Sequence, residues 1–294
     1  MLLDVGEGHT IYYEEHGIGK KPLVVLHGGP GGGGLHLRAL LPLFDLRRWR
    51  VILYDQRGCG RSTPFLSTRA NTTWHLVADL ERLREHLGIQ RWTLFGGSWG
   101  STLALAYASR HMSRVAGLVL RGICLMEPWE NRWLYEPGGV ARIAPAAWAE
   151  FALGRGRGSQ LRRYAPLLRN RRTRRRAAEA WAAYEDRLSH LRTPTRTTRG
   201  RLAESLAVLE NHYFLHSAWL RPGQLLAVAA QIPRSVPVEI IQGRYDLVCP
   251  SASAHALHAR IPHSRLTLTI AGHAALEPET ATALRSATDR LAQG

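Results

Sequence analysis

Seven short segments rich in apolar residues recur along the chain, and helix-like segments separate most of them. The expected strands are 10–15, 22–27, 50–55, 92–96, 115–121, 237–243 and 265–270. Several, such as Leu23-Val24-Val25-Leu26, are unbroken apolar runs, which are typical of strands covered on both faces of a mostly parallel sheet. The alternation with amphipathic segments, clearest at 73–87, predicts an α/β architecture.

The alternation stops between residues 125 and 229. This stretch is rich in Ala, Arg and Trp, has almost no strand signal, and is predicted to form several helices. Prolines are expected to separate those helices at 128, 137, 145, 166, 194 and 222. We therefore expect an α/β core from 1–124 and 230–294, with 125–229 inserted as a helical cap over one edge of the sheet.

Bulk properties narrow the class of protein further. No apolar run in the 294 residues approaches the 18–20 or so residues needed to cross a bilayer. The first residues lack the basic and apolar regions of a signal peptide. Three cysteines are too few and too scattered for a disulfide framework or a CxxC metal site. The sequence predicts a cytoplasmic protein with no membrane association and no structural metal.

The formal charge of +16 comes almost entirely from arginine. Ten arginines lie between residues 155 and 176 with no acidic residue among them. Such a block can bind nucleic acid or a membrane surface. No recognition motif with interleaved aromatic residues accompanies it, so we interpret it as a solvated helical face and expect no nucleic-acid partner.

The segment Gly96-Gly97-Ser98-Trp99-Gly100 matches the G-x-S-x-G pattern of a nucleophile elbow. Small residues flank the serine in this pattern because the turn is sharp. In a chain with 28 glycines the pattern alone could mark an ordinary strand-to-helix turn. Here it follows the expected strand 92–95 and opens a helical segment, which is the context an elbow requires. Ser98 is therefore the candidate nucleophile.

A serine hydroxyl becomes a good nucleophile when a histidine takes its proton. In the elbow arrangement an acid and then a histidine follow the serine in the chain, on loops after late strands. Asp246 and His273 each follow a late expected strand, so Ser98, Asp246 and His273 are predicted to form a catalytic triad. Other candidates for the base lie on or beside an expected helix: His255, His258 and His263.

Acyl transfer also needs N–H donors for the oxyanion. The backbone N–H of Trp99 directly follows the nucleophile, and a glycine-rich loop at 27–34 offers a second donor, which we assign to Gly29. A phosphate-binding loop is the alternative for this loop, but no Gly-Lys-Ser/Thr follows it. The predicted chemistry needs no cofactor and no metal.

Beyond these features, the chain resembles the proline iminopeptidases (prolyl aminopeptidases) among the α/β-hydrolases. The matching stretches are HGGPGGG at 27–33, DQRGCGRSTP at 55–64, residues 71–89, GGSWGSTLALAYA at 96–108, RGI at 121–123 and GRYDLVCP at 243–250. The resemblance covers most of 1–143 and 236–277 and is looser in the expected cap, at 180–185 and 210–214. It implies an α/β-hydrolase fold with a mostly parallel central sheet and an inserted helical cap.

The resemblance also implies removal of an N-terminal proline from short peptides. In that family two cap glutamates and an arginine line the site for the substrate's amino terminus, and the matching positions are Glu185, Glu210 and Arg121. The chain departs from the family at Cys124 and Leu134, where aromatic residues are usual near the proline pocket. These departures predict a roomier pocket that accepts alanine or substituted prolines.

Two alternatives to this reading remain. An esterase or amidase on the same scaffold would share the fold and triad, because these do not determine the substrate; such an enzyme has no need of the cap carboxylates. A non-catalytic binding protein that uses the arginine block is the alternative from another class. Salt-dependent nucleic-acid affinity without hydrolysis would support it.

Overall fold

The structure is a computed structural model that describes residues 1–154, 158–192 and 197–293. Eight strands form one sheet in the order β1-β2-β4-β3-β5-β6-β7-β8. Their bounds are β1 Leu2–Gly6, β2 His9–His16, β3 Lys21–Leu26, β4 Trp49–Asp55, β5 Trp92–Gly97, β6 Val115–Arg121, β7 Val238–Gly243 and β8 Arg265–Thr269. β1 and β2 run antiparallel to their neighbours, and the other pairs are parallel. The predicted α/β architecture is confirmed, and β1 is a strand that the sequence pattern did not reveal.

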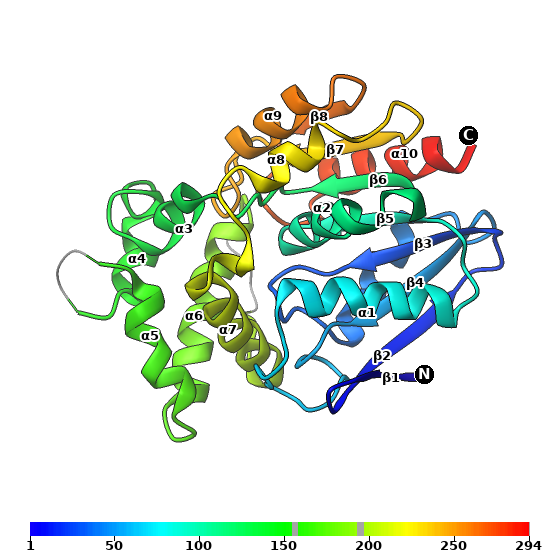
Figure 1. Ribbon diagram of the computed structural model, residues 1–294. Helices are drawn as coiled ribbons and strands as arrows, with labels where there is room; N and C mark the ends of the chain where they lie inside the picture. The colour runs from blue at the N-terminus through cyan, green and yellow to red at the C-terminus, as the bar shows by residue number, and fades with distance from the viewer. Residues whose placement is uncertain (155–157, 193–196, 294) are drawn as a thin grey trace.

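The helices lie between and around these strands (Figure 1). The α-helices are α1 Thr73–His86, α2 Trp99–His111, α3 Pro128–Tyr135, α4 Pro145–Phe151, α5 Gln160–Arg169, α6 Arg174–Ser189, α7 Gly200–Leu215, α8 Gln224–Ala229, α9 Ser251–Arg260 and α10 Pro278–Gln293. Short 3-10 helices are η1 Leu35–Leu43, η2 Met112–Arg114, η3 Val140–Arg142 and η4 Ser217–Trp219. None of the described helices is long and apolar enough to cross a membrane.

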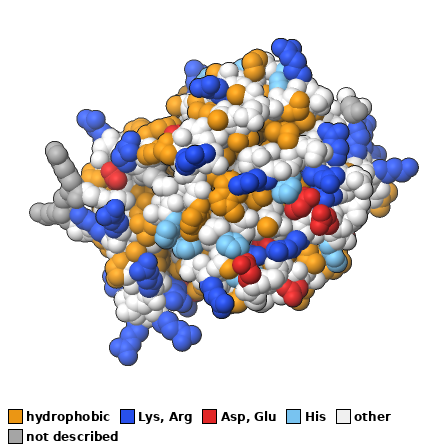
Figure 2. Space-filling view, viewed as in Figure 1, with side chains coloured by type: hydrophobic (Ala, Val, Ile, Leu, Met, Phe, Trp, Pro, Cys, Tyr) orange, Lys and Arg blue, Asp and Glu red, His pale blue; other side chains and the backbone are white. Residues whose placement is uncertain are grey.

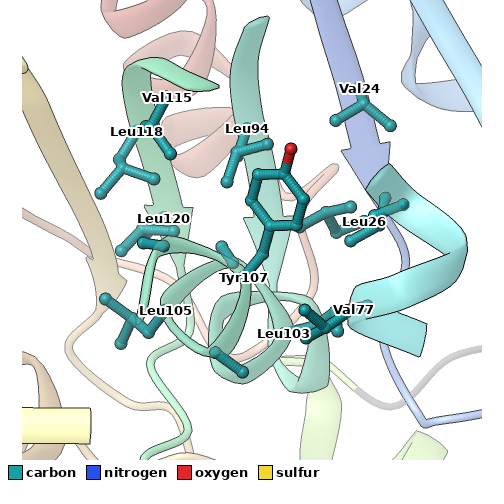
Figure 3. Packing of buried hydrophobic residues seen from close by; sticks show 14 of the residues in the cluster. Val24, Leu26, Val77, Leu94, Leu103, Leu105, Tyr107, Val115, Leu118 and Leu120 are labelled. Atoms are coloured by element: carbon teal, nitrogen blue, oxygen red, sulfur yellow. The ribbon is translucent and has the colours of Figure 1, made fainter. Parts of the chain in front are cut away.

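Both faces of the sheet are covered, which explains the unbroken apolar runs. On β3, Val24 and Leu26 belong to the buried cluster that includes α1 and α2. Their neighbours Leu23 and Val25 point to the opposite face, where η1 and α10 pack. Figure 3 shows the ring of Tyr107 on α2 beside Leu94 of β5 and Leu26 of β3. Because successive side chains of a strand point to opposite faces, each position of such a strand must be apolar.

Helices α3 to α7 come between β6 and β7 in the chain. In space they form a separate helical layer on one side of the sheet, at the left of Figure 1. Their buried aromatic cluster includes Trp181, which is fully buried, and a stacked Phe151–Tyr184 pair with ring centroids 4.0 Å apart. Helix α8, the last part of 125–229, instead packs Leu225 and Ala229 into the core cluster beneath α2. The division of the chain at 125 and 229 stays a prediction.

The prolines of this helical layer have different effects. Pro128 and Pro145 are the first residues of α3 and α4, a position that needs no N–H donor. Pro166, by contrast, lies inside α5, so the expected break there is wrong. It begins the last turn of α5, a helix held by buried side chains such as Tyr164, and this packing outweighs the lost hydrogen bond. Pro194 lies outside the described residues.

The arginine-rich segment 155–176 includes α5 and the start of α6. Residues 155–157 of it lie outside the described residues. Most of the other arginines between 162 and 176 are exposed, and Figure 2 shows basic side chains at this end of the molecule. Arg175 forms an ion pair with Glu179, with 3.2 Å between Nε and Oε1. The absence of a nucleic-acid partner stays a prediction.

Candidate active site

The turn between β5 and α2 holds Ser98 in a rare backbone conformation, with φ 58° and ψ −125°. A positive φ is uncommon outside glycine and costs free energy that the surrounding packing must supply. The flanking glycines are sterically required. A Cβ at Gly100 would collide with the carbonyl oxygen of Leu26, and one at Gly96 would collide with the carbonyl oxygen of Gly100. The glycines of the motif therefore let α2 begin directly against the end of β3.

Asp246 and His273 are joined by a hydrogen bond of 2.7 Å between Oδ2 and Nδ1. The Asp246 carboxylate is buried and accepts three further hydrogen bonds, from the backbone N–H groups of Val248 and Cys249 and from Gln242 Nε2. Because Asp246 accepts, Nδ1 of His273 carries the proton and Nε2 is left as the basic nitrogen. This is the tautomer that a general base needs.

Ser98 and His273 line one cavity of about 200 Å³. The cavity lies between the ends of the parallel strands and the helices α3, α6 and α7. The predicted site residues that line it are Gly29, Ser98, Trp99, Arg121, Cys124, Leu134, Glu185, Glu210 and His273. Asp246 reaches the cavity through its bond to His273. Within the described part of the chain, no cluster of His, Cys, Asp or Glu could hold a metal ion.

The three alternative histidines have other surroundings. His258 Nδ1 lies 2.8 Å from Ser264 Oγ, and His263 Nε2 lies 3.2 Å from the carbonyl oxygen of Val236. His255 is exposed on α9. None of the three is among the described residues that line the cavity, so the geometry favours His273 as the base.

The glycine-rich loop after β3 is held by a buried histidine. His27 Nδ1 donates to the carbonyl oxygen of Gly28 at 2.9 Å, and the N–H of Gly32 donates to the same oxygen at 3.1 Å. Nε2 of His27 accepts from the N–H of Gln56. Burial lowers the pKa of His27 to about 4, so it stays neutral. A carbonyl and the next N–H point in opposite directions across a trans peptide, so the N–H of Gly29 turns away from these groups.

Gln56 connects this loop to the start of α2. Its Nε2 donates to the carbonyl oxygen of His27 at 3.0 Å, and its Oε1 accepts from Trp99 Nε1 at 2.9 Å. Trp99 is the first residue of α2, where backbone N–H groups lack partners within the helix. The network therefore fixes two backbone donors, those of Gly29 and Trp99, relative to each other at the cavity wall.

Two carboxyl groups face the cavity from the helical layer. Glu185 on α6 and Glu210 on α7 share one donor, since Trp181 Nε1 lies 2.9 Å from Glu185 Oε1 and 2.6 Å from Glu210 Oε2. Tyr135 Oη donates to Glu185 Oε1 at 2.5 Å. The sequence analysis did not single out Trp181 or Tyr135. Trp181 lies one helical turn before Glu185, and Tyr135 directly follows Leu134, so their spacing was the available signal.

Burial and mutual repulsion keep this pair from ionising fully. Burial raises the pKa of Glu185 to about 7, and burial together with the nearby Glu185 raises the pKa of Glu210 well above its usual range. The two groups are also hydrogen-bonded to each other, which requires a shared proton. The two side chains therefore titrate as a unit rather than as two independent acids.

Arg121 lies on the same side of the cavity as Ser98 and His273. Its guanidinium Nη1 donates to the carbonyl oxygen of His273 at 2.5 Å, and its own carbonyl oxygen accepts from the N–H of Ser98 at 2.8 Å. The resemblance placed this arginine with the amine-binding glutamates. The structure shows it joining the loops that carry Ser98 and His273, so its visible role is to position them.

Known proteins are similar to this chain over nearly its full length. A family model described as the alpha/beta hydrolase fold matches residues 21–280. The chain is similar to a proline iminopeptidase of Neisseria gonorrhoeae, with 41% identity over 98% of this chain and 94% of that protein. It is also similar to a proline iminopeptidase of Arabidopsis thaliana, with 41% identity over 98% of this chain and 78% of that protein.

Solved structures also share the fold of this chain. A bromoperoxidase from Bacillus anthracis superposes with a TM-score of 0.70 at 22% identity, covering 100% of this chain and 99% of that one. Together with the family model, this places the chain among the α/β-hydrolases. Its full-length relatives place it more narrowly: the chain belongs to the proline iminopeptidase family.

The raised pKa of Glu185 predicts how stability depends on pH. A folded-state pKa raised from 4.5 to about 7 means that the folded protein binds more protons between these values, so stability is lost as the pH rises through 7. Glu210→Gln replaces a carboxyl with an amide that can still donate to Glu185. We expect the Tm of this variant, relative to wild type, to increase between pH 6 and pH 8.

Thermal unfolding across this range is the measurement, and Glu150→Gln, on an exposed ion pair with Arg187, is the control. A constant difference in Tm between Glu210→Gln and wild type from pH 6 to pH 8 would contradict the shared proton.

Proposed function

We propose that this protein is a serine aminopeptidase that releases N-terminal proline from short peptides. The observation that carries the proposal is the pair of half-buried Glu185 and buried Glu210, which line the same cavity as Ser98. Membership of the proline iminopeptidase family supports it. In this proposal 1–124 and 230–294 form the catalytic core, and the cap 125–229 supplies the site for the substrate's amino terminus.

The triad would act through an acyl-enzyme. His273, oriented by Asp246, takes the proton of Ser98 through Nε2 while Oγ attacks the carbonyl carbon of the first residue. The protonated His273 then donates this proton to the leaving amine as the peptide bond breaks. Water, activated by the same nitrogen, hydrolyses the prolyl ester and frees Ser98.

The oxyanion would be stabilised by the N–H groups of Trp99 and Gly29. Donors that are fixed before the reaction need no reorganisation when the negative charge develops, and loss of one such donor costs roughly 3–4 kcal/mol. The hydrogen bonds of His27 and Gln56 described above hold the backbone segments that carry these two N–H groups. Support for this assignment is that both residues line the cavity with Ser98.

Recognition of the amino terminus would follow from charge. A protonated amine can donate to both carboxylates, and hydrogen bonds to charged groups are worth roughly 1.5–3 kcal/mol each. Binding of the cation favours the ionised form, so the shared proton of Glu185 and Glu210 is released. An acetylated N-terminus has no positive charge and would leave the two carboxyl groups without a charged partner.

The pocket for the first side chain would be formed in part by Cys124 and Leu134. Both line the cavity together with Phe214, Tyr135 and Val248. Neither is aromatic, so the ring of proline would be packed less tightly on this side. A discrimination that rests on a few methylene contacts is worth about 1–3 kcal/mol, or 10- to 200-fold.

The requirement for a free amine can be tested with two arylamides. We expect hydrolysis of proline arylamide and no measurable hydrolysis of its N-acetylated form. In Glu210→Gln, kcat/KM for the free substrate should fall at least tenfold, mainly through KM, while the Glu150→Gln control should behave as wild type. Equal cleavage of the acetylated substrate, or of simple aryl esters, would favour the esterase alternative.

The proposed roles of Ser98 and Asp246 can be tested by substitution. Ser98→Ala should abolish turnover. Asp246→Asn should lower kcat by about 10⁴-fold, because an amide donates to Nδ1 of His273 and leaves the proton on Nε2. Steady-state rates with proline arylamide measure both effects, with Asp45→Asn on the surface as the control and circular dichroism as the check on folding. A folded Asp246→Asn variant with more than a tenth of wild-type kcat would rule out this role.

The shape of the side-chain pocket predicts the range of substrates. We expect kcat/KM for alanine arylamide to lie within a thousandfold of that for proline arylamide, because Cys124 and Leu134 leave the pocket wider. Cys124→Phe should increase the preference for proline. A preference above a thousandfold in the wild type, or no change in Cys124→Phe, would show that these positions do not set the selectivity.

A further inference from the structure

Two of the three cysteines lie in the candidate active site. Cys124 follows β6 and is half-buried, and Cys249 lies between β7 and α9 and is buried. Both line the cavity, and Sγ of Cys249 lies 4.0 Å from Oγ of Ser98. Cys59 is fully buried on the loop after β4, where its thiol donates to the carbonyl oxygen of Gln56. The cavity thus contains a pair of thiols beside the proposed nucleophile.

The two thiols are neighbours in the cavity wall. The nearby Cys124 thiol and burial raise the pKa of Cys249 well above its usual range, and Sγ of Cys124 also donates to Sδ of Met126 at 3.6 Å. Hydrogen bonds also hold both backbones. The N–H of Cys124 donates to Ser101 Oγ at 3.1 Å and its carbonyl oxygen accepts from Thr102 Oγ1 at 2.7 Å. The N–H of Cys249 donates to Asp246 Oδ1 at 2.7 Å. The sulfur atoms are therefore kept as neighbours by two separate loops.

We propose that Cys124 and Cys249 form a reversible disulfide when the protein meets a peroxide, and that this bond switches the hydrolase off. The effect on activity rests on the function proposed above, whereas the bond itself does not. The class of co-reactant is a hydroperoxide small enough to enter the cavity, such as hydrogen peroxide.

The chemistry balances with one peroxide for each disulfide. Cys124, the more exposed thiol, attacks one peroxide oxygen as its thiolate, the O–O bond breaks, and Cys124 becomes a sulfenic acid while hydroxide leaves and is protonated to water. The sulfur of Cys249 then attacks the sulfur of Cys124 and displaces hydroxide, which leaves as water with the proton of Cys249. Two thiols are oxidised and hydrogen peroxide is reduced to two waters. A dithiol reductant reverses the bond by exchange.

The position of the bond explains the loss of activity. A disulfide draws its two sulfur atoms to about 2.05 Å, so the two thiols must move closer and the loops must adjust. The loop of Cys249 supplies an N–H donor to Asp246, which orients His273. Cys124 belongs to the proposed wall of the side-chain pocket. The bond would therefore disturb both the base and the pocket.

The test combines activity with mass. Fully reduced wild-type protein is treated with hydrogen peroxide, the peroxide is removed, and free thiols are blocked under denaturing conditions. We expect at least a tenfold loss of proline arylamide hydrolysis, a mass lower by two hydrogens, a linked pair of peptides containing residues 124 and 249, and recovery of activity with dithiothreitol.

Variants separate the pair from a single reactive thiol. Each is compared with its own untreated sample, so altered basal activity does not matter. Cys59→Ala should respond as wild type, and Cys124→Ser should keep its activity under the same treatment because the remaining Cys249 is protonated and buried. Inactivation of Cys124→Ser as fast as wild type would overturn the proposal. So would an unlinked 124–249 peptide pair in inactivated protein, or a linked pair in fully active protein.

The mass readout keeps the two proposals distinguishable. A protein that forms the 124–249 link but never cleaves proline arylamide would contradict the proposed function alone. A protein that cleaves this substrate and forms no link would contradict the disulfide alone.

Discussion

The close approach of α2 to the end of β3 is the constraint on which the rest of the site depends. Helix α2 begins so near Leu26 that Gly100 has no room for a Cβ. This contact holds Ser98 at a positive φ, places the N–H of Trp99 at the cavity, and brings the loop of His27 beside the same turn. The other two residues of the proposed triad, Asp246 and His273, then need only follow neighbouring strands to meet it. One steric requirement thus fixes both the proposed nucleophile and the proposed oxyanion donors.

A second connection joins the helical layer to this turn. Ser205 Oγ on α7 donates to the carbonyl oxygen of Gly31 at 2.8 Å, and a Cβ at Gly31 would collide with the backbone of Ser205. Glu210 lies on the same helix, little more than one turn further along. The distance between Glu210 and the glycine-rich loop is therefore set within one helix. An aminopeptidase needs such a fixed distance, because the amine and the scissile carbonyl of its substrate are separated by a single Cα.

The sequence allowed the strand ends and the site residues they carry to be predicted, because G-x-S-x-G, the glycine-rich loop and the positions of Asp246 and His273 depend on local patterns. The sequence pattern missed β1, an edge strand whose side chains are mostly exposed. It also predicted a helix break at Pro166 that is wrong, because tertiary packing there outweighs helix propensity. Contacts between distant segments were also hidden. No periodicity relates Trp181 to Glu210, or Cys124 to Cys249, since each pair joins two elements whose relative placement only the fold determines.

The pair Glu185 and Glu210 connects the electrostatics of the cavity to its proposed selectivity. Burying two acids together is unfavourable, and the raised pKa values of Glu185 and Glu210 express this cost. A ligand that brings a positive charge removes the repulsion and restores hydrogen bonds to both groups. A neutral ligand of the same shape leaves the cost in place and also excludes the water that could have compensated it. Discrimination against blocked or internal residues would therefore come as much from the penalty on the wrong ligand as from attraction to the right one.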